Sequence, residues 1–305
     1  MMPVFEAVLP IFLLIVVGGV VKRGFIGNAD FWGAADKLVY YLFFPALLLL
    51  EVSRAEFSGR DTFPALAAVA GATTMVGLLV FAGQVFVRVP CNLFTSIFQG
   101  GVRYNSYVFM ALSQSLFGED GVALSGVFVA YMIVLTNVMS VMVMNLYAAD
   151  GKKSMCSMLL AFLRNPLIVG ALIGLALNLC KVGVHGFPEQ LLRYLGNAAT
   201  PLSLMSVGAG LVVVTNARAA MVIMYASSLK LLVLPAITFA ILKVLGVSGV
   251  AANVALLYAT VPCAGNAYIL ARQMGGDHEA MASIITWTTV GSSATITAIL
   301  SLALA

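Results

Sequence analysis

The stretch ATVPCAGNAYILA, residues 259–271, interrupts an apolar segment with a proline, a glycine and an asparagine. Pro262 removes a backbone donor from any helix that passes through this point, and Gly265 tolerates backbone angles that other residues avoid. A second stretch, FQGGVRYNSY at 98–107, has Gly100–Gly101 in place of the proline and the same Asn-x-Tyr pattern. Each stretch therefore predicts a helix that is broken within an apolar span.

The rest of the chain has the composition of a membrane protein. Of its 305 residues, 62% are hydrophobic and 9% are charged, and the mean hydropathy is +1.05. A soluble domain is only about half apolar, whereas a membrane-spanning helix needs about 20 mostly apolar residues in a row. We therefore predict an all-α integral membrane protein with ten transmembrane helices. The ten windows are 4–22, 35–51, 64–87, 92–116, 121–147, 165–181, 192–213, 219–242, 250–273 and 280–303.

The placement of lysine and arginine predicts the orientation, because basic residues are retained on the cytoplasmic side. The loops that follow odd-numbered windows hold nine basic residues: Lys22, Arg23, Lys37, Arg88, Lys152, Lys153, Arg164, Arg218 and Arg272. The opposite side holds five: Arg54, Arg60, Lys181, Arg193 and Lys243. This asymmetry predicts a multi-pass plasma membrane protein with both termini outside the cytoplasm and residues 148–164 as a short cytoplasmic linker.

Two basic residues, Arg103 and Lys230, fall near the centres of the fourth and eighth windows. A charged side chain at that depth costs at least about 2.5 to 3.5 kcal/mol on insertion scales, so it normally faces a cavity or a partner. Both side chains are candidates for a substrate pathway. The alternative is that each is held in a structural pair or offsets helix dipoles.

Landmarks recur between the two halves of the chain. The Asn-x-Tyr copies that begin at Asn105 and Asn266 lie 161 residues apart, and Pro45 and Pro201 lie 156 apart. Two five-helix repeats are predicted, at 1–147 and 165–305. Because five is odd, the second repeat enters the membrane from the opposite side, an arrangement common in carriers, which bind substrate where broken helices meet at the midplane.

Asn105 and Asn266 fall where the second half of each broken helix is expected to begin. Asparagine is a favoured N-cap, and helix N-termini attract anions. The two asparagines are therefore predicted to cap the half-helices and to face a ligand, although capping and packing alone would also explain them. Tyr107 and Tyr268 are weaker candidates, since a tyrosine in a span more often packs with its hydroxyl satisfied locally.

Longer segments resemble a known family. They are DKLVYYLFFPALLL (36–49), RYNSY (103–107), FLRNPLIVGALIGLALN (162–178), ATPLSLMSVGAGL (199–211) and ATVPCAGNAYILARQMGGDHEAMASIITWTT (259–289). On these segments the chain resembles the bacterial form of the auxin efflux carrier family, which includes malonate and malate transporters. That family is related in fold to PIN auxin carriers and to sodium/bile-acid symporters.

The resemblance implies that helices 4 and 9 cross at the midplane, here around Gly101 to Ser106 and Pro262 to Asn266. It further implies a transport domain of helices 3–5 and 8–10, and a scaffold domain of helices 1, 2, 6 and 7 that forms a homodimer. Unlike the plant carriers, this chain has no proline at the first crossing and has a short central linker, which disfavours auxin as substrate. The expected substrate-binding residues are Arg103, Tyr104, Asn105, Ser106, Tyr107, Lys230, Pro262, Cys263, Gly265, Asn266 and Tyr268.

The expected activity is elevator-type transport of a small organic anion across the bacterial inner membrane. The planar fork of Arg103 suits a carboxylate, and a second cation at Lys230 favours a dicarboxylate such as malonate or malate. No cofactor, metal or nucleic-acid partner is indicated. The coupling ion stays open between proton, sodium and membrane potential, because the acidic residues are expected in loops or near span ends, with Glu6 and Glu51 closest to the membrane interior.

An intramembrane enzyme is disfavoured. Ser248 lies in a GVSG sequence, but no histidine falls within a window to serve as its base, and neither HExxH nor a pair of intramembrane aspartates is present. A non-transporting sensor with the same fold remains an alternative, as does a carrier of a neutral or bile-acid-like substrate coupled to sodium.

Overall fold

The computed structural model describes residues 2–54, 61–147, 166–210 and 217–303, and within these ranges the protein is helical with no strand. The predicted linker, 148–164, lies outside the described residues. The first half contains α1 (Met2–Gly24), α2 (Ala29–Leu38), the π-helix η1 (Val39–Phe43), α3 (Phe44–Arg54), α4 (Thr62–Phe86), α5 (Cys91–Val102) and α6 (Ser106–Tyr147). The second half contains α8 (Pro166–Leu179), α9 (Phe187–Gly210), α10 (Ala217–Ser228), the π-helix η2 (Leu229–Val233), α11 (Leu234–Leu245), α12 (Gly249–Thr260), α13 (Asn266–Met274) and α14 (His278–Ala303).

The described helices confirm the membrane class. Five segments are long and apolar enough to cross a bilayer: Ala29–Arg54, Thr62–Phe86, Leu124–Tyr147, Ala220–Leu245 and His278–Leu300. The described parts of all ten predicted windows lie largely on helices, and α6 turns at Gly118, which has a left-handed φ of 62°, between the fourth and fifth windows. The count of ten membrane crossings and their inverted symmetry remain predictions.

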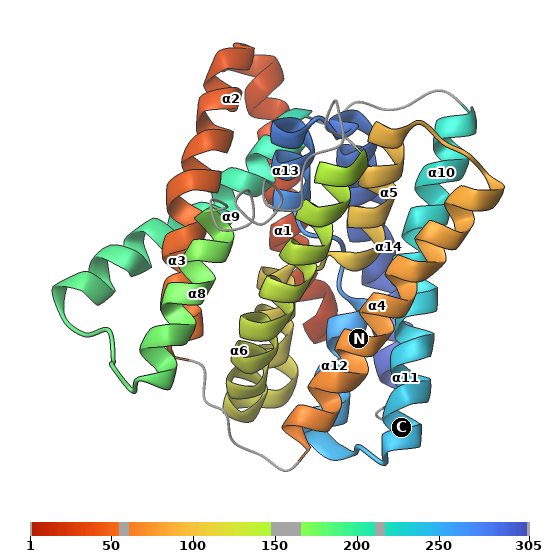
Figure 1. Cartoon of the computed structure of the whole chain (residues 1–305). Helices are drawn as coiled ribbons and strands as arrows, with labels where there is room; N and C mark the ends of the chain where they lie inside the picture. Colours follow the sequence, from red (N-terminus) through yellow and green to blue (C-terminus); the bar gives the residue numbers. More distant parts are fainter. Residues whose placement is uncertain (1, 55–60, 148–165, 211–216, 304–305) are drawn as a thin grey trace.

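Two groups of helices pack closely within themselves (Figure 1). In one, α1, α2 and α3 pack on α9, and α3 also packs on α8; in the other, α4, α5 and α10 to α14 pack together, and α6 contacts both groups. Glycine permits the first group's close approach: an ideal Cβ on Gly208 would lie 1.8 Å from the carbonyl oxygen of Ile15, and one on Gly170 would lie 2.6 Å from that of Pro45. Small residues at such contacts let helix backbones approach closely.

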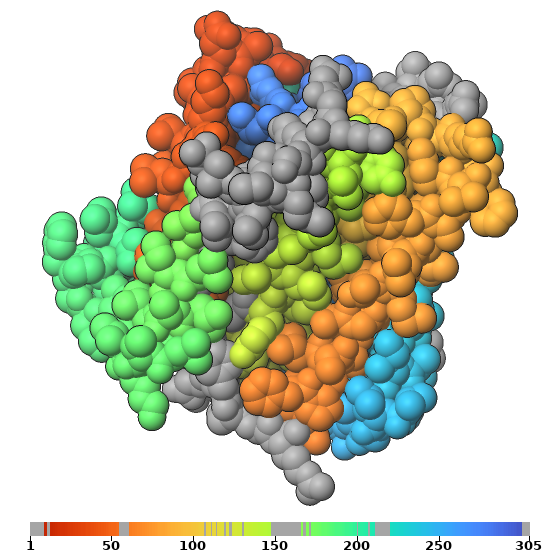
Figure 2. Space-filling model, viewed as in Figure 1, coloured from red at the N-terminus to blue at the C-terminus, as the bar shows by residue number. Residues whose placement is uncertain are grey.

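One side of the molecule carries a projecting apolar surface. In the space-filling view, α8 and the beginning of α9 extend to one side (Figure 2). Leu172, Ile173 and Leu179 of α8 are exposed there. Exposed apolar side chains on a helix are what a lipid environment favours.

Both predicted helix breaks are present. The first lies between α5 and α6, where Arg103 has extended backbone angles (φ −80°, ψ 152°). The second lies between α12 and α13, across Val261 to Gly265, where Pro262 cannot donate to a helical ladder. The two breaks touch, because the backbone N–H of Asn105 donates to the carbonyl oxygen of Pro262 at 2.9 Å.

The glycine pair was expected to form the first break, but it does not. Gly100 and Gly101 are helical, and α5 continues to Val102. Their lack of a side chain serves packing instead, since an ideal Cβ on Gly100 would lie 2.7 Å from a side-chain carbon of Ile284 in α14. The break therefore falls two residues later than the glycines suggested.

Candidate functional site

Arg103 is buried at the first break, with 3% of its surface exposed. Its Nη2 donates to Oδ1 of Asn137 at 2.7 Å and to Oδ1 of Asn266 at 3.0 Å. These acceptors come from α6 and α13, so the guanidinium joins three segments distant in the chain. Its Nε and Nη1 have no hydrogen-bond partner among the described residues. The cation is thus positioned by neutral amides and keeps unused donors.

The two asparagines at the breaks have different roles. Asn105 caps α6, as predicted, because its Oδ1 accepts from the backbone N–H of Val108 at 3.2 Å. Asn266 does not cap α13; the helix begins at Asn266 itself, the N-cap residue is Gly265, and no side chain caps it. The amide of Asn266 binds Arg103 instead. The cap prediction is therefore correct for the first copy and wrong for the second.

A small cavity, with about 30 Å³ open to the centres of water-sized molecules, lies beside these residues. Six of the eleven predicted site residues line it: Arg103, Tyr104, Asn105, Ser106, Gly265 and Asn266. The opposite wall comes from Phe44 and Leu48 of α3 and from Ser203 and Leu204 of α9. Ile133, Thr136 and Asn137 of α6 and Ala264 complete the lining. The cavity therefore lies between the two groups of helices and has the second halves of both broken helices at its wall.

A family comparison supplies the general activity. The model of the family described as "Membrane transport protein" matches residues 3–300. The chain belongs to this family. It is also 26% identical over 305 residues to the "Putative malonate transporter" of Rhizobium meliloti (strain 1021), with 96% of this chain and 93% of the relative covered. This membrane transport protein is accordingly a transporter and not an enzyme, which confirms both the resemblance to the auxin efflux carrier family and the exclusion of an enzyme.

Four other predicted residues of this transporter lie away from the cavity lining. Pro262 and Cys263 bind backbone at the second break: the Pro262 carbonyl accepts from Asn105, and the Cys263 thiol donates to the carbonyl of Gln99 at 3.8 Å. Tyr268 lies against α9, where an ideal Cβ on Gly210 would come within 2.6 Å of its ring. The fourth, Lys230, is fully buried in η2. The side chain of Tyr107, the eleventh, lies outside the described side chains.

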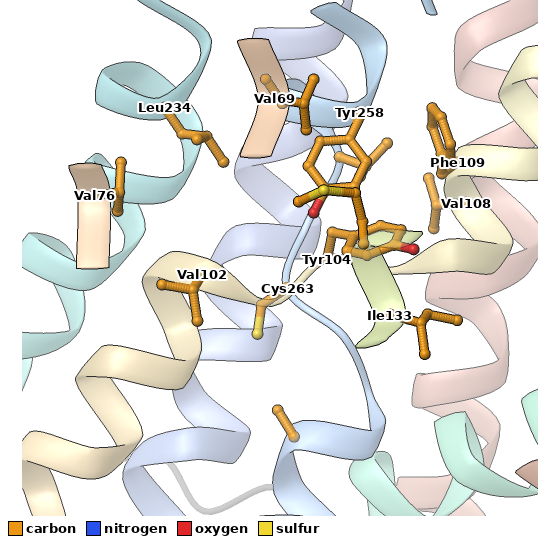
Figure 3. Packing of buried hydrophobic residues seen from close by; sticks show 14 of the residues in the cluster. Val69, Val76, Val102, Tyr104, Val108, Phe109, Ile133, Leu234, Tyr258 and Cys263 are labelled. Atoms are coloured by element: carbon orange, nitrogen blue, oxygen red, sulfur yellow. The ribbon is translucent and has the colours of Figure 1, made fainter. Parts of the chain in front are cut away.

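Tyr104 faces two environments. It lines the cavity, and its ring centroid lies 4.2 Å from that of Tyr258. Figure 3 shows the two rings together, with Phe109 and Val108 to one side and Cys263 on the adjacent break. The ring of Phe109 meets Tyr258 edge-on at 5.5 Å. This aromatic cluster gives the unwound backbone of the first break a rigid wall.

Sequence reasoning missed Asn137, which completes the binding of Arg103. The residue lies in the fifth window within the apolar sequence VLTNVMS, where only its amide distinguishes it. A buried amide in such a window signals a polar partner, but the sequence does not say which one. Ser203 was missed for the same reason: its hydroxyl belongs to the cavity only because α9 packs against the breaks.

One acidic residue at the end of a predicted span is buried. Asp36 is fully buried in α2, and its Oδ2 lies 3.0 Å from Nη1 of Arg272 in α13. The hydroxyl of Ser206 in α9 donates to the other carboxylate oxygen. Arg272, which the orientation analysis counted among the loop residues, lies in the last turn of α13 and ties this helix to α2. This ion pair joins the two groups of helices.

The electrostatics around the cavity favour an anion. Arg103 brings a positive charge, and the N-termini of α6 and α13 bring the positive ends of two helix dipoles, with Ser106 and Asn266 as their first residues. No carboxylate is among the residues that line the described cavity. A carboxylate ligand would find charge, free N–H donors and helix ends on one wall.

Proposed function

We propose that this family member is a secondary transporter of a small organic anion, a mono- or dicarboxylate such as malonate or malate. The observation that carries the proposal is Arg103, a buried arginine held only by amides and with Nε and Nη1 unpaired at the wall of a cavity. The planar guanidinium bonds both oxygens of a carboxylate, and burial strengthens that bond. The relative named as a malonate transporter supports the same class of substrate.

Binding would use the groups already described. The free N–H groups of Arg103 take one carboxylate, while Asn105, Ser106 and Gly265 offer amide, hydroxyl and backbone groups at the helix ends. On the facing wall, Ser203 offers a hydroxyl and Leu204 an apolar contact. A short dicarboxylate with one carboxylate on Arg103 would reach the facing wall with the other.

The proposed mechanism is alternating access of the elevator type. Helices α4 to α6 and α10 to α14 would form the transport domain, and α1 to α3, α8 and α9 the scaffold, within a ten-helix inverted repeat of residues 1–147 and 165–305. The contact between Asn105 and Pro262 supports treating the two breaks as the midplane crossing that moves with the anion. A cavity between the two groups of helices suits a substrate that is released by sliding one group against the other.

The same proposal includes a homodimer through the scaffold and an inner-membrane location with both termini outside. Tyr107, Pro262, Cys263 and Tyr268 remain proposed as positions around the crossing, where they would shape the backbone that meets the substrate. Pro262 supports this most directly, because its carbonyl holds the first break.

Uptake into proteoliposomes tests the proposal. The parent is expected to exchange labelled malonate or malate with internal unlabelled anion, and the neutral analogue malonamide should not compete. Arg103→Ala should lower kcat/KM for exchange by at least about 30-fold, because truncating one partner of a buried charge interaction costs roughly 2 to 5 kcal/mol.

The control for this test is Arg88→Ala, which removes an exposed arginine outside the cavity and should leave exchange unchanged. Both variants are checked for folding by size-exclusion chromatography and thermal unfolding. A folded Arg103→Ala that exchanges malonate like the parent would contradict the anion site. Transport of malonamide as well as malonate would indicate a neutral substrate.

A further inference from the structure

Lys230 is the second buried cation, and it has no hydrogen-bond acceptor among the described residues. Its side chain is fully buried, and its Nζ is unpaired. The ion pairs formed by described residues use Asp36 and Glu189, and neither involves Lys230. Between Glu189 and Asp277 the sequence has no acidic residue at all. An ammonium in this position therefore has no carboxylate and no hydrogen-bond acceptor among the described residues to offset its desolvation.

The surroundings of Lys230 contain no carboxylate that would hold its proton permanently. The segment η2 packs against α4, α5, α10, α11, α12 and α14. The nearby titratable groups are Tyr258, whose ring makes a cation–π contact with Nζ at 5.6 Å from its centroid, and the thiol of Cys263. The acidic residues of the packed helices, Asp61 at the start of α4 and Glu279 in the first turn of α14, lie at helix ends.

The backbone around Lys230 is not a regular α-helix. Lys230 lies in a single π-helical turn, and Pro235 follows two residues after that turn. Since Pro235 has no N–H, the preceding turn loses a helical donor and can widen. Such π-turns occur often at functional sites.

Lys230 lies outside the anion cavity, but its charge acts electrostatically on groups near the cavity. It does not line that cavity. Cys263 is close enough to both Lys230 and Arg103 for each cation to act electrostatically on its thiol, and the thiol donates to the carbonyl of Gln99 in α5. A charge on Lys230 would therefore raise the positive potential at the second break without contacting the substrate.

We propose that the Lys230 amine is a proton-binding site that couples anion transport to a proton gradient. This inference rests on the proposed function. The amine takes one proton from water on the side where the anion binds, and the ammonium and the anion cross together. On the other side the anion leaves and the ammonium returns its proton to water, so the empty carrier goes back with a neutral amine. One proton accompanies each anion, no covalent bond other than N–H forms or breaks, and no carboxylate is needed.

The competing explanation is a fixed ammonium that offsets the C-termini of α5 and α12, which end at Val102 and Thr260 near the crossing. Two substitutions separate the explanations. Lys230→Arg keeps a permanent charge, whereas Lys230→Met removes the charge and retains an unbranched side chain. Lys243→Met is the matched control, because Lys243 lies on the following helix and is exposed.

Transport is measured in proteoliposomes with the membrane potential clamped. In the parent and in Lys243→Met, a pH difference of one unit should produce about tenfold accumulation of labelled malonate. Lys230→Arg should still exchange malonate but should not accumulate it, because a carrier that stays charged when it is empty cannot return. Lys230→Met should bind malonate more weakly and show no response to the pH difference. Parental accumulation in either folded Lys230 variant would overturn the inference.

A measurement on the substrate-free parent keeps the test independent of how the variants fold. The chain has seven lysines, so the Cε resonance of Lys230 in lipid nanodiscs can be assigned by its loss in Lys230→Met or Lys230→Arg. It should change as the amine loses its proton within the pH range of the transport assay. A lysine resonance that stays that of an ammonium throughout would overturn the inference. Failure of the parent to exchange malonate would instead contradict the proposed function, so the two failures are distinguishable.

Discussion

Arg103 and Arg272 both connect helices that are distant in the chain, but their partners differ in charge. Arg103 is held by the amides of Asn137 and Asn266, while Arg272 is held by the carboxylate of Asp36. An amide oxygen accepts a hydrogen bond without neutralising the guanidinium, whereas a carboxylate neutralises it. The charge of Arg103 therefore remains available to a ligand, whereas the charge of Arg272 is neutralised in a contact between the two groups of helices.

The largest expected effect comes from giving Arg103 a carboxylate partner like the one that Arg272 has. Asn137→Asp places a carboxylate beside Nη2 of Arg103, which now lies 2.7 Å from an amide oxygen. A substrate anion would then have to displace an internal one, so kcat/KM for malonate exchange should fall by about 100-fold or more. The measurement is initial exchange rate against malonate concentration in proteoliposomes.

Asn137→Ala is the control for that substitution. It removes one acceptor but leaves the charge of Arg103 in place, so its loss of exchange should be smaller than that of Asn137→Asp. Equal losses in the two variants would show that the position of Arg103, and not its charge, limits binding. Parental exchange by Asn137→Asp would show that the carboxylate and the substrate do not compete.

The second prediction concerns a variant in which Arg272 loses its carboxylate partner. Asp36→Asn leaves the polar contacts of Ser206 and Arg272 without a negative charge. Because the Arg272 side chain is 34% exposed, the loss should be about 2 kcal/mol, below the roughly 3 to 5 kcal/mol of a fully buried pair. The measurement is the midpoint of thermal unfolding in detergent.

Glu189→Gln supplies the matched comparison for that measurement. Glu189 pairs with Arg54 and Arg193, whose side chains are 40% and 53% exposed. Solvent screens exposed ion pairs, so this variant should unfold close to the parent. Asp36→Asn and Glu189→Gln could both unfold at nearly the same temperature as the parent. That result would show that Asp36 and Arg272 do not stabilise the contact between the helix groups.

Sequence patterns predicted that Arg103 is buried and that both breaks exist, because hydropathy windows and a proline are local signals. They did not predict the partner of Arg103, since Asn137 is brought to it by tertiary packing across the fifth window. Asp36 was overlooked because it lies at the edge of a window. An acidic residue there looks the same in the sequence whether it is exposed at a helix end or buried in an ion pair. The glycine pair was assigned to the first break because glycine marks both unwound backbone and close packing.

The smallest effect distinguishes the two asparagines. Asn105 accepts from the N–H of Val108, so Asn105→Ala should lower stability by about 1 kcal/mol, as expected for a lost N-cap, and Asn105→Ser should restore most of it. Asn266→Ala should change stability less through capping, because α13 has no side-chain cap, but it should weaken malonate binding by removing an acceptor from Arg103. Thermal unfolding with and without malonate separates these effects. If serine rescues position 266 but not position 105, the two roles are reversed, and the first break is held by its contact with Pro262 alone.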